Sequence, residues 1–185
     1  RIVELFLNAG PGYGCSCLPK DVKAIMNFSS KVGVSPLFLN AVEKTNQQQI
    51  KKIKKLIEKN CGNLKGKNIS VLGLAFKPKT DDIRDSISLK IIEKLLKKQA
   101  KVIVHDPMAI ENVRKIFKSK IKYANSISNA LKDSYCGVIM TAWPEYSKIT
   151  NINIKNMKKR IIIDSRRILK NSKLDCTYNA IGIGN

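Results

Sequence analysis

The chain is 185 residues long, which is enough to bury the core of one domain and a substantial extension. Its net charge of +21 raises nucleic acid and anionic membranes as partners, but the basic residues are spread along the chain. The densest run, KKIKKLIEK at residues 51–59, interleaves lysine with apolar residues at helical spacing, as on the solvated face of an amphipathic helix. No apolar run approaches the ~20 residues that span a bilayer. We therefore expect a cytoplasmic protein that binds neither nucleic acid nor a membrane.

The cysteines and the single histidine exclude the common metal-binding patterns. Five cysteines occur, without CxxC or Cys/His metal spacing, and His105 is the only histidine. We expect reduced thiols, one of which can be reactive, and no metal site.

The chain opens on an apolar segment and a glycine-rich loop. Residues 1–7, RIVELFL, read as the middle of an apolar element, so we expect the chain to be a piece of a longer protein. Residues 8–19 form a loop rich in glycine and proline, and a helix can begin directly after it at Pro19. This helix should run to about Lys31 and end at Gly33. The loop therefore delivers its cysteines to a helix N-terminus.

A second, longer helix is predicted to begin at Pro36, with Ser35 as its N-cap. It should run to about Asn60. Its buried face is expected to consist of Leu39, Val42, Ile50, Ile53 and Ile57.

After this helix the pattern changes, and we expect a boundary between a helical segment, residues 1–64, and a second domain, residues 65–185. The predicted strands cover residues 69–74, 101–106, 121–124, 137–142 and 160–164. Helices are expected between them at residues 86–99, 109–118, 126–132 and 153–158. Continuous apolar strands separated by amphipathic helices indicate a doubly wound, Rossmann-like α/β fold with a parallel sheet.

Ligands of such sheets bind at the carboxyl ends of the strands. The residues of interest that follow the predicted strands are Phe76, Lys77, Asp106, Trp143, Glu145, Asp164, Arg166 and Arg167. The first strand leads into GLAFKPKTDD, which lacks the GxGxxG fingerprint of a dinucleotide site. A nucleotide held by a lysine therefore fits this domain better than a dinucleotide.

Cys17 is the strongest candidate for a reactive residue. A thiol is nucleophilic as the thiolate, and a helix N-terminus with Lys20 beside it favours that form. The glycines of the preceding loop would let a substrate approach the backbone closely. A buried, inert cysteine is the alternative that spacing leaves open. Asp21, one turn on, can orient or deprotonate a water, or it can simply complement the helix dipole.

Four basic side chains form a second group of candidates: Lys77, Arg84, Arg166 and Arg167. Basic groups at strand ends suit phosphate oxygens, and arginine offers a bidentate fork. Each alone is more often a surface charge. Together they favour an anionic ligand at this edge of the sheet.

These residues lie in segments that resemble a known family. GPGYGCSCLPKDVKAI, residues 10–25, resembles the active-site signature GPGFGGSCFPKDxxAL of the UDP-glucose/GDP-mannose dehydrogenase family. The segment at residues 71–109, beginning VLGLAFKPKTDD, resembles the opening of that family's UDP-sugar-binding domain. The pattern continues through TAWPEY and IIIDSRRIL to the glycines of GIGN. The resemblance covers essentially the whole chain, and two long motifs in the right order make it specific.

The resemblance implies an NAD-dependent, four-electron oxidation of a sugar C6 alcohol, converting UDP-glucose to UDP-glucuronate. A first hydride transfer makes an aldehyde, to which the Cys17 thiolate adds; a second hydride transfer gives a thioester, and water releases the uronate. Cysteine suits this sequence because a thiohemiacetal still donates hydride and a thioester remains hydrolysable.

The family's site residues carry over onto matching positions of this chain. The resemblance assigns proton transfer to Asp21 and the sugar pocket to Tyr13 and Gly14. It also assigns UDP contacts to Phe76 and Lys77, a contact with the UDP-sugar to Arg166, and an NAD contact to Arg84. Three departures stand beside these matches. Cys15 occupies a position where the family usually has glycine, Leu18 replaces the commoner phenylalanine, and Ser165 replaces a frequent glycine.

The resemblance also implies partners. The family's N-terminal NAD-binding Rossmann domain is absent from this sequence, and we expect turnover to require it. We expect a homodimer formed through the helix at residues 36–60, although its apolar face can also pack on the chain's own domain.

Three alternatives remain at this stage. A related dehydrogenase could take GDP-mannose or a UDP-N-acetylhexosamine, because base and sugar specificity depend partly on residues outside this sequence. A non-catalytic module could bind a nucleotide sugar or pair with a partner subunit. A nucleic-acid-binding protein rests on net charge alone and would require steeply salt-dependent binding.

Overall fold

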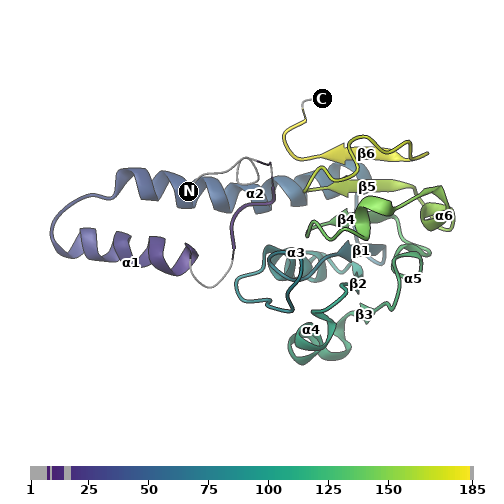
Figure 1. The fold of residues 1–185 in the computed structure, drawn as a ribbon, viewed down its shortest axis with the longest axis horizontal. Helices are drawn as coiled ribbons and strands as arrows, with labels where there is room; N and C mark the ends of the chain where they lie inside the picture. Colours follow the sequence, from purple (N-terminus) through teal and green to yellow (C-terminus); the bar gives the residue numbers. More distant parts are fainter. Residues whose placement is uncertain (1–7, 9, 15–17, 184–185) are drawn as a thin grey trace.

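The computed structural model describes residue 8, residues 10–14 and residues 18–183. Two helices come first, α1 (Leu18–Lys31) and α2 (Leu37–Cys61). They run side by side as a hairpin that projects from the rest of the molecule (Figure 1). The second helix begins one residue later than predicted, with Pro36 at its N-cap position.

The remaining elements alternate between strand and helix around one sheet. The strands are β1 (Asn68–Leu72), β2 (Lys101–His105), β3 (Lys122–Tyr123), β4 (Cys136–Ile139), β5 (Ile161–Asp164) and β6 (Thr177–Ala180). The helices are α3 (Ile87–Lys97), α4 (Ile110–Phe117), α5 (Ile127–Leu131) and α6 (Asn151–Ile154), with 3₁₀ turns η2 (Lys118–Lys120) and η3 (Tyr146–Lys148). All neighbouring strands pair in parallel, in the order β3-β2-β1-β4-β5-β6. This is the doubly wound order predicted from the alternation of elements, with its switch point between β1 and β4.

Helices cover both faces of the sheet, so the strands are apolar on both sides. Side chains from α2, α3 and α4 pack on one face, where Val71 and Val138 point. On the other face Leu72 and Ile139 pack with residues of α5 and α6. Successive strand residues thus enter different cores, which explains the continuous apolar runs in the sequence.

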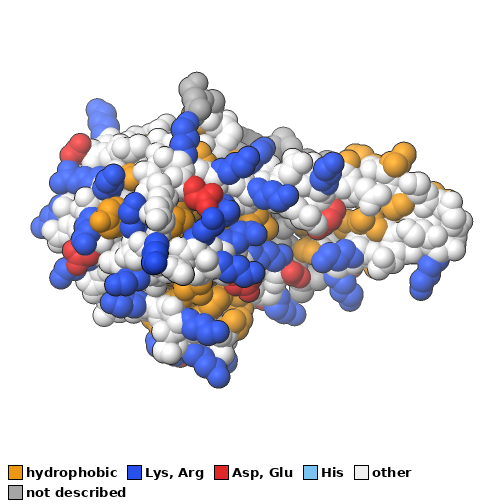
Figure 2. Space-filling view, turned by 180° about the vertical axis from the view of Figure 1, so that it is seen from behind, with side chains coloured by type: hydrophobic (Ala, Val, Ile, Leu, Met, Phe, Trp, Pro, Cys, Tyr) orange, Lys and Arg blue, Asp and Glu red, His pale blue; other side chains and the backbone are white. Residues whose placement is uncertain are grey.

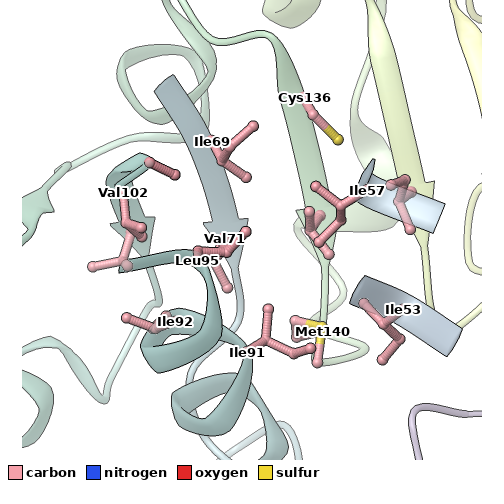
Figure 3. Close-up of a cluster of buried hydrophobic side chains, with 14 of the residues drawn as sticks. Ile53, Ile57, Ile69, Val71, Ile91, Ile92, Leu95, Val102, Cys136 and Met140 are labelled. Atoms are coloured by element: carbon pink, nitrogen blue, oxygen red, sulfur yellow. The ribbon is translucent and has the colours of Figure 1, made fainter. Parts of the chain in front are cut away.

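The second half of α2 belongs to the first of these cores. Ile53 and Ile57 are fully buried and reach toward Cys136 and Met140 of the β4 region (Figure 3). Leu39, Val42 and Ile50, which we also predicted to be buried, are only half-buried. The helix therefore has one end fixed on the sheet while its other end projects with α1.

Two elements differ from the sequence prediction. Strand β6 was missed, because its four residues are mostly half-exposed and show no apolar run. Helix α6 spans Asn151–Ile154 rather than residues 153–158, and its earlier start follows from the capping box formed by Thr150 and Asn153.

Candidate functional site

A narrow cleft lies at the carboxyl edge of the sheet, at the switch point. The loop at residues 10–14 forms one wall, and residues after β1, β4 and β5 together with the start of α3 form the others. Its lining consists of Pro11, Gly12, Gly14, Ala75, Phe76, Ser86, Ile87, Ser88, Met140 and Arg166. Three of the residues predicted to bind substrate, Gly14, Phe76 and Arg166, thus come together here.

The ends of β1 and β4 approach each other closely at this edge. Gly73 has a φ of +93°, and a Cβ there would lie only 2.5 Å from the Cβ of Thr141. The Thr141 hydroxyl donates to the carbonyl of Ala75 at 2.6 Å. Only glycine fits this position, and the close approach fixes where the chain leaves β1.

Asp106, directly after β2, organises the same edge. This buried carboxylate accepts hydrogen bonds from the backbone N–H groups of Leu74 (2.7 Å) and Ala75 (3.2 Å). The N–H groups of Met108 and Ala109 donate to its other oxygen at 2.9 and 2.8 Å, and the indole of Trp143 donates at 3.1 Å. A dinucleotide fold uses the amides after its first strand to hold a pyrophosphate. Here two of those amides already bind Asp106, so this loop is not a dinucleotide cradle.

Arg166 is held by the backbone carbonyl of Met140, just after β4, and by the carboxylate of Asp164 at the end of β5. Its Nε donates to the carbonyl of Met140 at 2.9 Å, and its own N–H donates to the Asp164 carboxylate at 2.9 Å. Burial lowers the pKa of Arg166, an effect that the nearby Asp164 opposes. Its Nη1 lies 3.1 Å from where a Cβ on Gly10 would stand. A positive charge is therefore held between the sheet edge and the glycine loop, as an anionic ligand would require.

The glycine loop is also tied to α2. The Tyr13 hydroxyl donates to Glu43 Oε2 at 2.8 Å. The Tyr13 N–H donates to Asn46 Oδ1 at 2.8 Å, and Asn46 Nδ2 donates back to the Tyr13 carbonyl at 3.0 Å. Tyr13 lines a hollow of about 470 Å³ against α2 rather than the cleft of Arg166.

Hydrogen bonding at Glu43 shifts two pKa values. Bonds from Gln47 and then Tyr13 lower the pKa of Glu43, and burial together with Glu43 raises the pKa of Tyr13 to about 12. Because the folded-state pKa of Glu43 is depressed, the stability from these bonds is present above the ordinary carboxyl pKa. It is lost as the pH falls through the folded-state value.

Gln47→Ala is expected to raise the pKa of Glu43 toward its ordinary value, and Tyr13→Phe should raise it by less, since the Gln47 bond has the larger effect. Carboxyl NMR titration measures both shifts. Gln48→Ala, at an exposed neighbour on the same helix, is the matched control and should leave the titration unchanged. An unshifted Glu43 in Gln47→Ala would contradict the prediction.

The other predicted site residues lie around the cleft. A Cβ on Gly14 would stand 2.7 Å from the carbonyl oxygen of Asp85, so the loop runs against the segment before α3. Lys77 is exposed, with its Nζ 5.4 Å from the centroid of the Phe76 ring. Arg84 is exposed and bound to the Asp82 carboxylate, with a closest N–O distance of 2.7 Å.

Of the two predicted catalytic residues, Asp21 is among the described residues and Cys17 is not. Asp21 lies exposed in the first turn of α1. Cys17 and Cys15 lie outside the described residues, and Cys17 directly precedes Leu18, where α1 begins. Arg167, predicted near the anion site, instead donates from Nε to the carbonyl of Ile181 at 2.7 Å.

Sequence reasoning missed Glu43 and Asn46 as parts of this region. Helical periodicity places both on α2, but their contact with a loop some 30 residues earlier has no local signature. The sequence placed Asp106 after a strand, but it did not predict the five hydrogen bonds that its carboxylate accepts.

Comparison with known proteins decides the family. Residues 70–171 match the model of the UDP-glucose/GDP-mannose dehydrogenase family, UDP binding domain, and residues 1–48 match that family's central domain. The chain belongs to the UDP-glucose/GDP-mannose dehydrogenase family. The UDP-glucose 6-dehydrogenase of Rickettsia felis is 39% identical over 98% of this chain. That of Haloferax volcanii is 40% identical over 91% of it.

Solved structures agree with this membership. The chain resembles the UDP-glucose dehydrogenase of Pyrobaculum islandicum with a TM-score of 0.88 and 32% identity, over 97% of this chain. It resembles the UDP-D-ManNAc dehydrogenase of Pyrococcus horikoshii with a TM-score of 0.77 and 27% identity, over 94%.

The match covers less than half of these proteins. This chain spans 42% of the Rickettsia felis protein, 39% of the Haloferax volcanii protein, 40% of the Pyrobaculum islandicum chain and 39% of the Pyrococcus horikoshii chain. Within the described residues of our chain, no helix combines the length and apolarity needed to cross a membrane.

Proposed function

We propose that this chain is the nucleotide-sugar-binding and thiol-bearing part of an NAD-dependent UDP-glucose 6-dehydrogenase. The observation that carries the proposal is the convergence of the glycine loop, Phe76 and Arg166 on one cleft at the switch point. The names of the relatives with 39–40% identity favour UDP-glucose as the substrate.

In this proposal the sheet edge holds the UDP moiety. Arg166 offers a fixed cation to the diphosphate or sugar. Phe76 offers an aromatic face in the cleft, and the exposed Lys77 beside it adds a second charge that can move toward phosphate. Gly14 lets the sugar approach the loop backbone, and Tyr13 positions that loop against α2.

Cys17 is proposed as the nucleophile. It directly precedes α1, and a helix N-terminus favours the thiolate. The thiolate adds to the C6 aldehyde formed in the first oxidation, and the second oxidation converts the thiohemiacetal to a thioester. Water attacks the thioester, expels the thiolate and leaves the uronate. Asp21, one helical turn on, is the proposed group that moves the proton of that water.

NAD would accept a hydride in each of the two oxidations. The amides after β1 are bound to Asp106, which supports NAD binding by another domain. Arg84, exposed and held by Asp82, is the side chain of this chain proposed to reach NAD. The proposal therefore includes an NAD-binding domain as a partner. Within this chain, the proposed boundary between the helical segment and the nucleotide-sugar-binding domain lies between residues 64 and 65.

A homodimer is proposed through the projecting hairpin. Large apolar side chains are exposed on α1, on α2 and between them: Leu18, Ile25, Phe28, Val32, Val34, Leu37 and Phe38. Figure 2 shows apolar side chains on this arm, with lysines and arginines beside them and over the rest of the molecule. A group of exposed apolar side chains such as this one marks an interaction site. A second copy, the NAD-binding domain or both can cover it.

A related substrate is the alternative within the same chemistry. It is supported by the structural similarity to the UDP-D-ManNAc dehydrogenase of Pyrococcus horikoshii. In the proposal, Phe76, Lys77 and Arg166 serve mainly the UDP moiety, which these nucleotide sugars share, so the cleft does not by itself select one hexose.

The test is NAD reduction by the full-length enzyme that carries this chain. We expect about two NADH for each UDP-glucose consumed, as a four-electron oxidation requires. UDP-N-acetylhexosamines and GDP-mannose are the comparison substrates, and a preference for one of them would correct the sugar. Absence of NADH with all three classes would leave a non-catalytic nucleotide-sugar-binding module.

A further inference from the structure

The side chain of Asn46 is matched to the backbone of the glycine loop. Its carboxamide bonds to both the N–H and the carbonyl of Tyr13, at 2.8 and 3.0 Å. One bond uses the amide as acceptor and the other uses it as donor, so only a carboxamide in this orientation satisfies both. Asn46 therefore accepts one hydrogen bond from the Tyr13 backbone and donates one to it, as a residue of a neighbouring β-strand does.

Gly12 makes room for this contact. A Cβ at Gly12 would lie 2.3 Å from Asn46 Oδ1, and the residue has a φ of +109°. A side chain at this position would displace the carboxamide and would also strain the backbone. The loop and Asn46 thus fit each other in shape as well as in hydrogen bonding.

The helix that carries Asn46 also carries the sheet contact. Ile53, two turns later on α2, is fully buried in the core against the sheet. The cleft residues Phe76 and Arg166 lie shortly after strands β1 and β5 of that same sheet. A rigid helix therefore links the position of the loop to the position of the cleft.

We propose that Asn46 is a positioning residue, which holds the loop leading to Cys17 in register with the nucleotide-sugar cleft. The proposal rests on the function proposed above. It adds that the carboxamide of Asn46 on α2 fixes the loop backbone at Tyr13. A misplacement of about 1 Å at a reacting centre can lower turnover by about a hundredfold.

Two variants test the proposal. Asn46→Ala removes both hydrogen bonds to the Tyr13 backbone, with Asn40→Ala as its control, and Asn46→Asp removes only one of them. Aspartate has nearly the same shape, so it keeps the packing and the acceptor for the Tyr13 N–H. It removes the donor and sets a carboxylate oxygen against the Tyr13 carbonyl. Asn40→Asp is the matched control, because it makes the same change at an exposed position on the same helix.

Three quantities are measured in the full-length enzyme: exchange of the Tyr13 amide hydrogen, kcat with UDP-glucose, and affinity for UDP. In Asn46→Ala, which removes the acceptor for the Tyr13 N–H, we expect exchange to accelerate by about tenfold. We expect kcat to fall by about a hundredfold in both Asn46 variants. UDP affinity should stay within about twofold, because Phe76 and Arg166 are unchanged. Asn40→Asp should alter none of the three.

The outcomes separate this proposal from the proposed function. Unchanged Tyr13 exchange in Asn46→Ala would overturn the clamp, whatever the activity. Faster exchange with unchanged kcat would overturn the positioning role. A parallel loss of UDP affinity would also overturn it, because Asn46 would then support the cleft itself. A wild-type enzyme without NADH formation overturns the proposed function and the role in chemistry, while exchange at Tyr13 still decides the clamp.

Discussion

Replacing Cys17 by serine is expected to lower turnover of UDP-glucose by at least about a thousandfold, as loss of a covalent nucleophile does in other enzymes. A serine hydroxyl is not ionised at neutral pH, and the helix N-terminus that favours a thiolate cannot lower its pKa enough. UDP affinity should persist, because Phe76 and Arg166 remain in the cleft. Steady-state NADH formation and calorimetric titration with UDP measure the two quantities.

Two further serine variants serve as controls. Cys176 lies directly before β6, at the opposite edge of the sheet from the cleft, so Cys176→Ser should keep wild-type turnover. Cys15→Ser changes the second thiol of the loop and should keep most of it. Turnover in Cys17→Ser within about tenfold of wild type would rule out an essential thiol, since one tenfold step corresponds to only ~1.4 kcal/mol. A larger loss in Cys15→Ser would transfer the role to the neighbouring cysteine.

Asp106→Ala is expected to destabilise the sheet domain by about 4 kcal/mol, a fall in Tm of about 8–16 °C for a chain of this size. Five donors converge on this buried carboxylate, four from backbone and one from Trp143. Alanine would leave these donors without an acceptor, and all but the N–H of Met108 lie in buried hydrogen bonds. Thermal denaturation followed by circular dichroism measures the loss.

Asp106→Asn and Asp175→Ala bracket the effect. Asparagine keeps the size and one acceptor oxygen, so its loss should be smaller. Asp175 is 78% exposed and pairs with Arg160 at the surface, and its removal should cost no more than about 1 kcal/mol. If Asp106→Ala were as mild as Asp175→Ala, the converging hydrogen bonds would not be what holds the ends of β1, β2 and β4 together.

Much of the fold could be predicted from local pattern. Buried strands between amphipathic helices gave five of the strands and all the long helices within a few residues, because burial on both faces leaves a continuous apolar run. Strand β6 was not predictable in this way. Its sequence, TYNA, is half-exposed, and its identity as a strand depends on pairing with β5.

Some parts of the candidate site could likewise be predicted from the sequence, and others could not. The motifs around Cys17 and Phe76 could be found from the sequence because each is contiguous. The position of Phe76 and Arg166 at one edge of the sheet could also be predicted, because both follow strands. Their meeting with Gly14 could not, because the glycine loop reaches this edge only through tertiary contacts. The direction of Tyr13 toward α2 was likewise invisible, since it depends on Glu43 and Asn46.

By itself, the sequence determined the family resemblance, the order of the elements and the loop that carries the candidate thiol. Each of these is encoded by neighbouring residues, through periodicity, capping and contiguous motifs. Only the tertiary structure decided that Asp106 occupies the amides after β1, that Arg166 faces the glycine loop, and that α2 joins this loop to the sheet. The physical reason is that buried hydrogen bonds must be satisfied, and their partners here lie 26 to 33 residues apart in the chain.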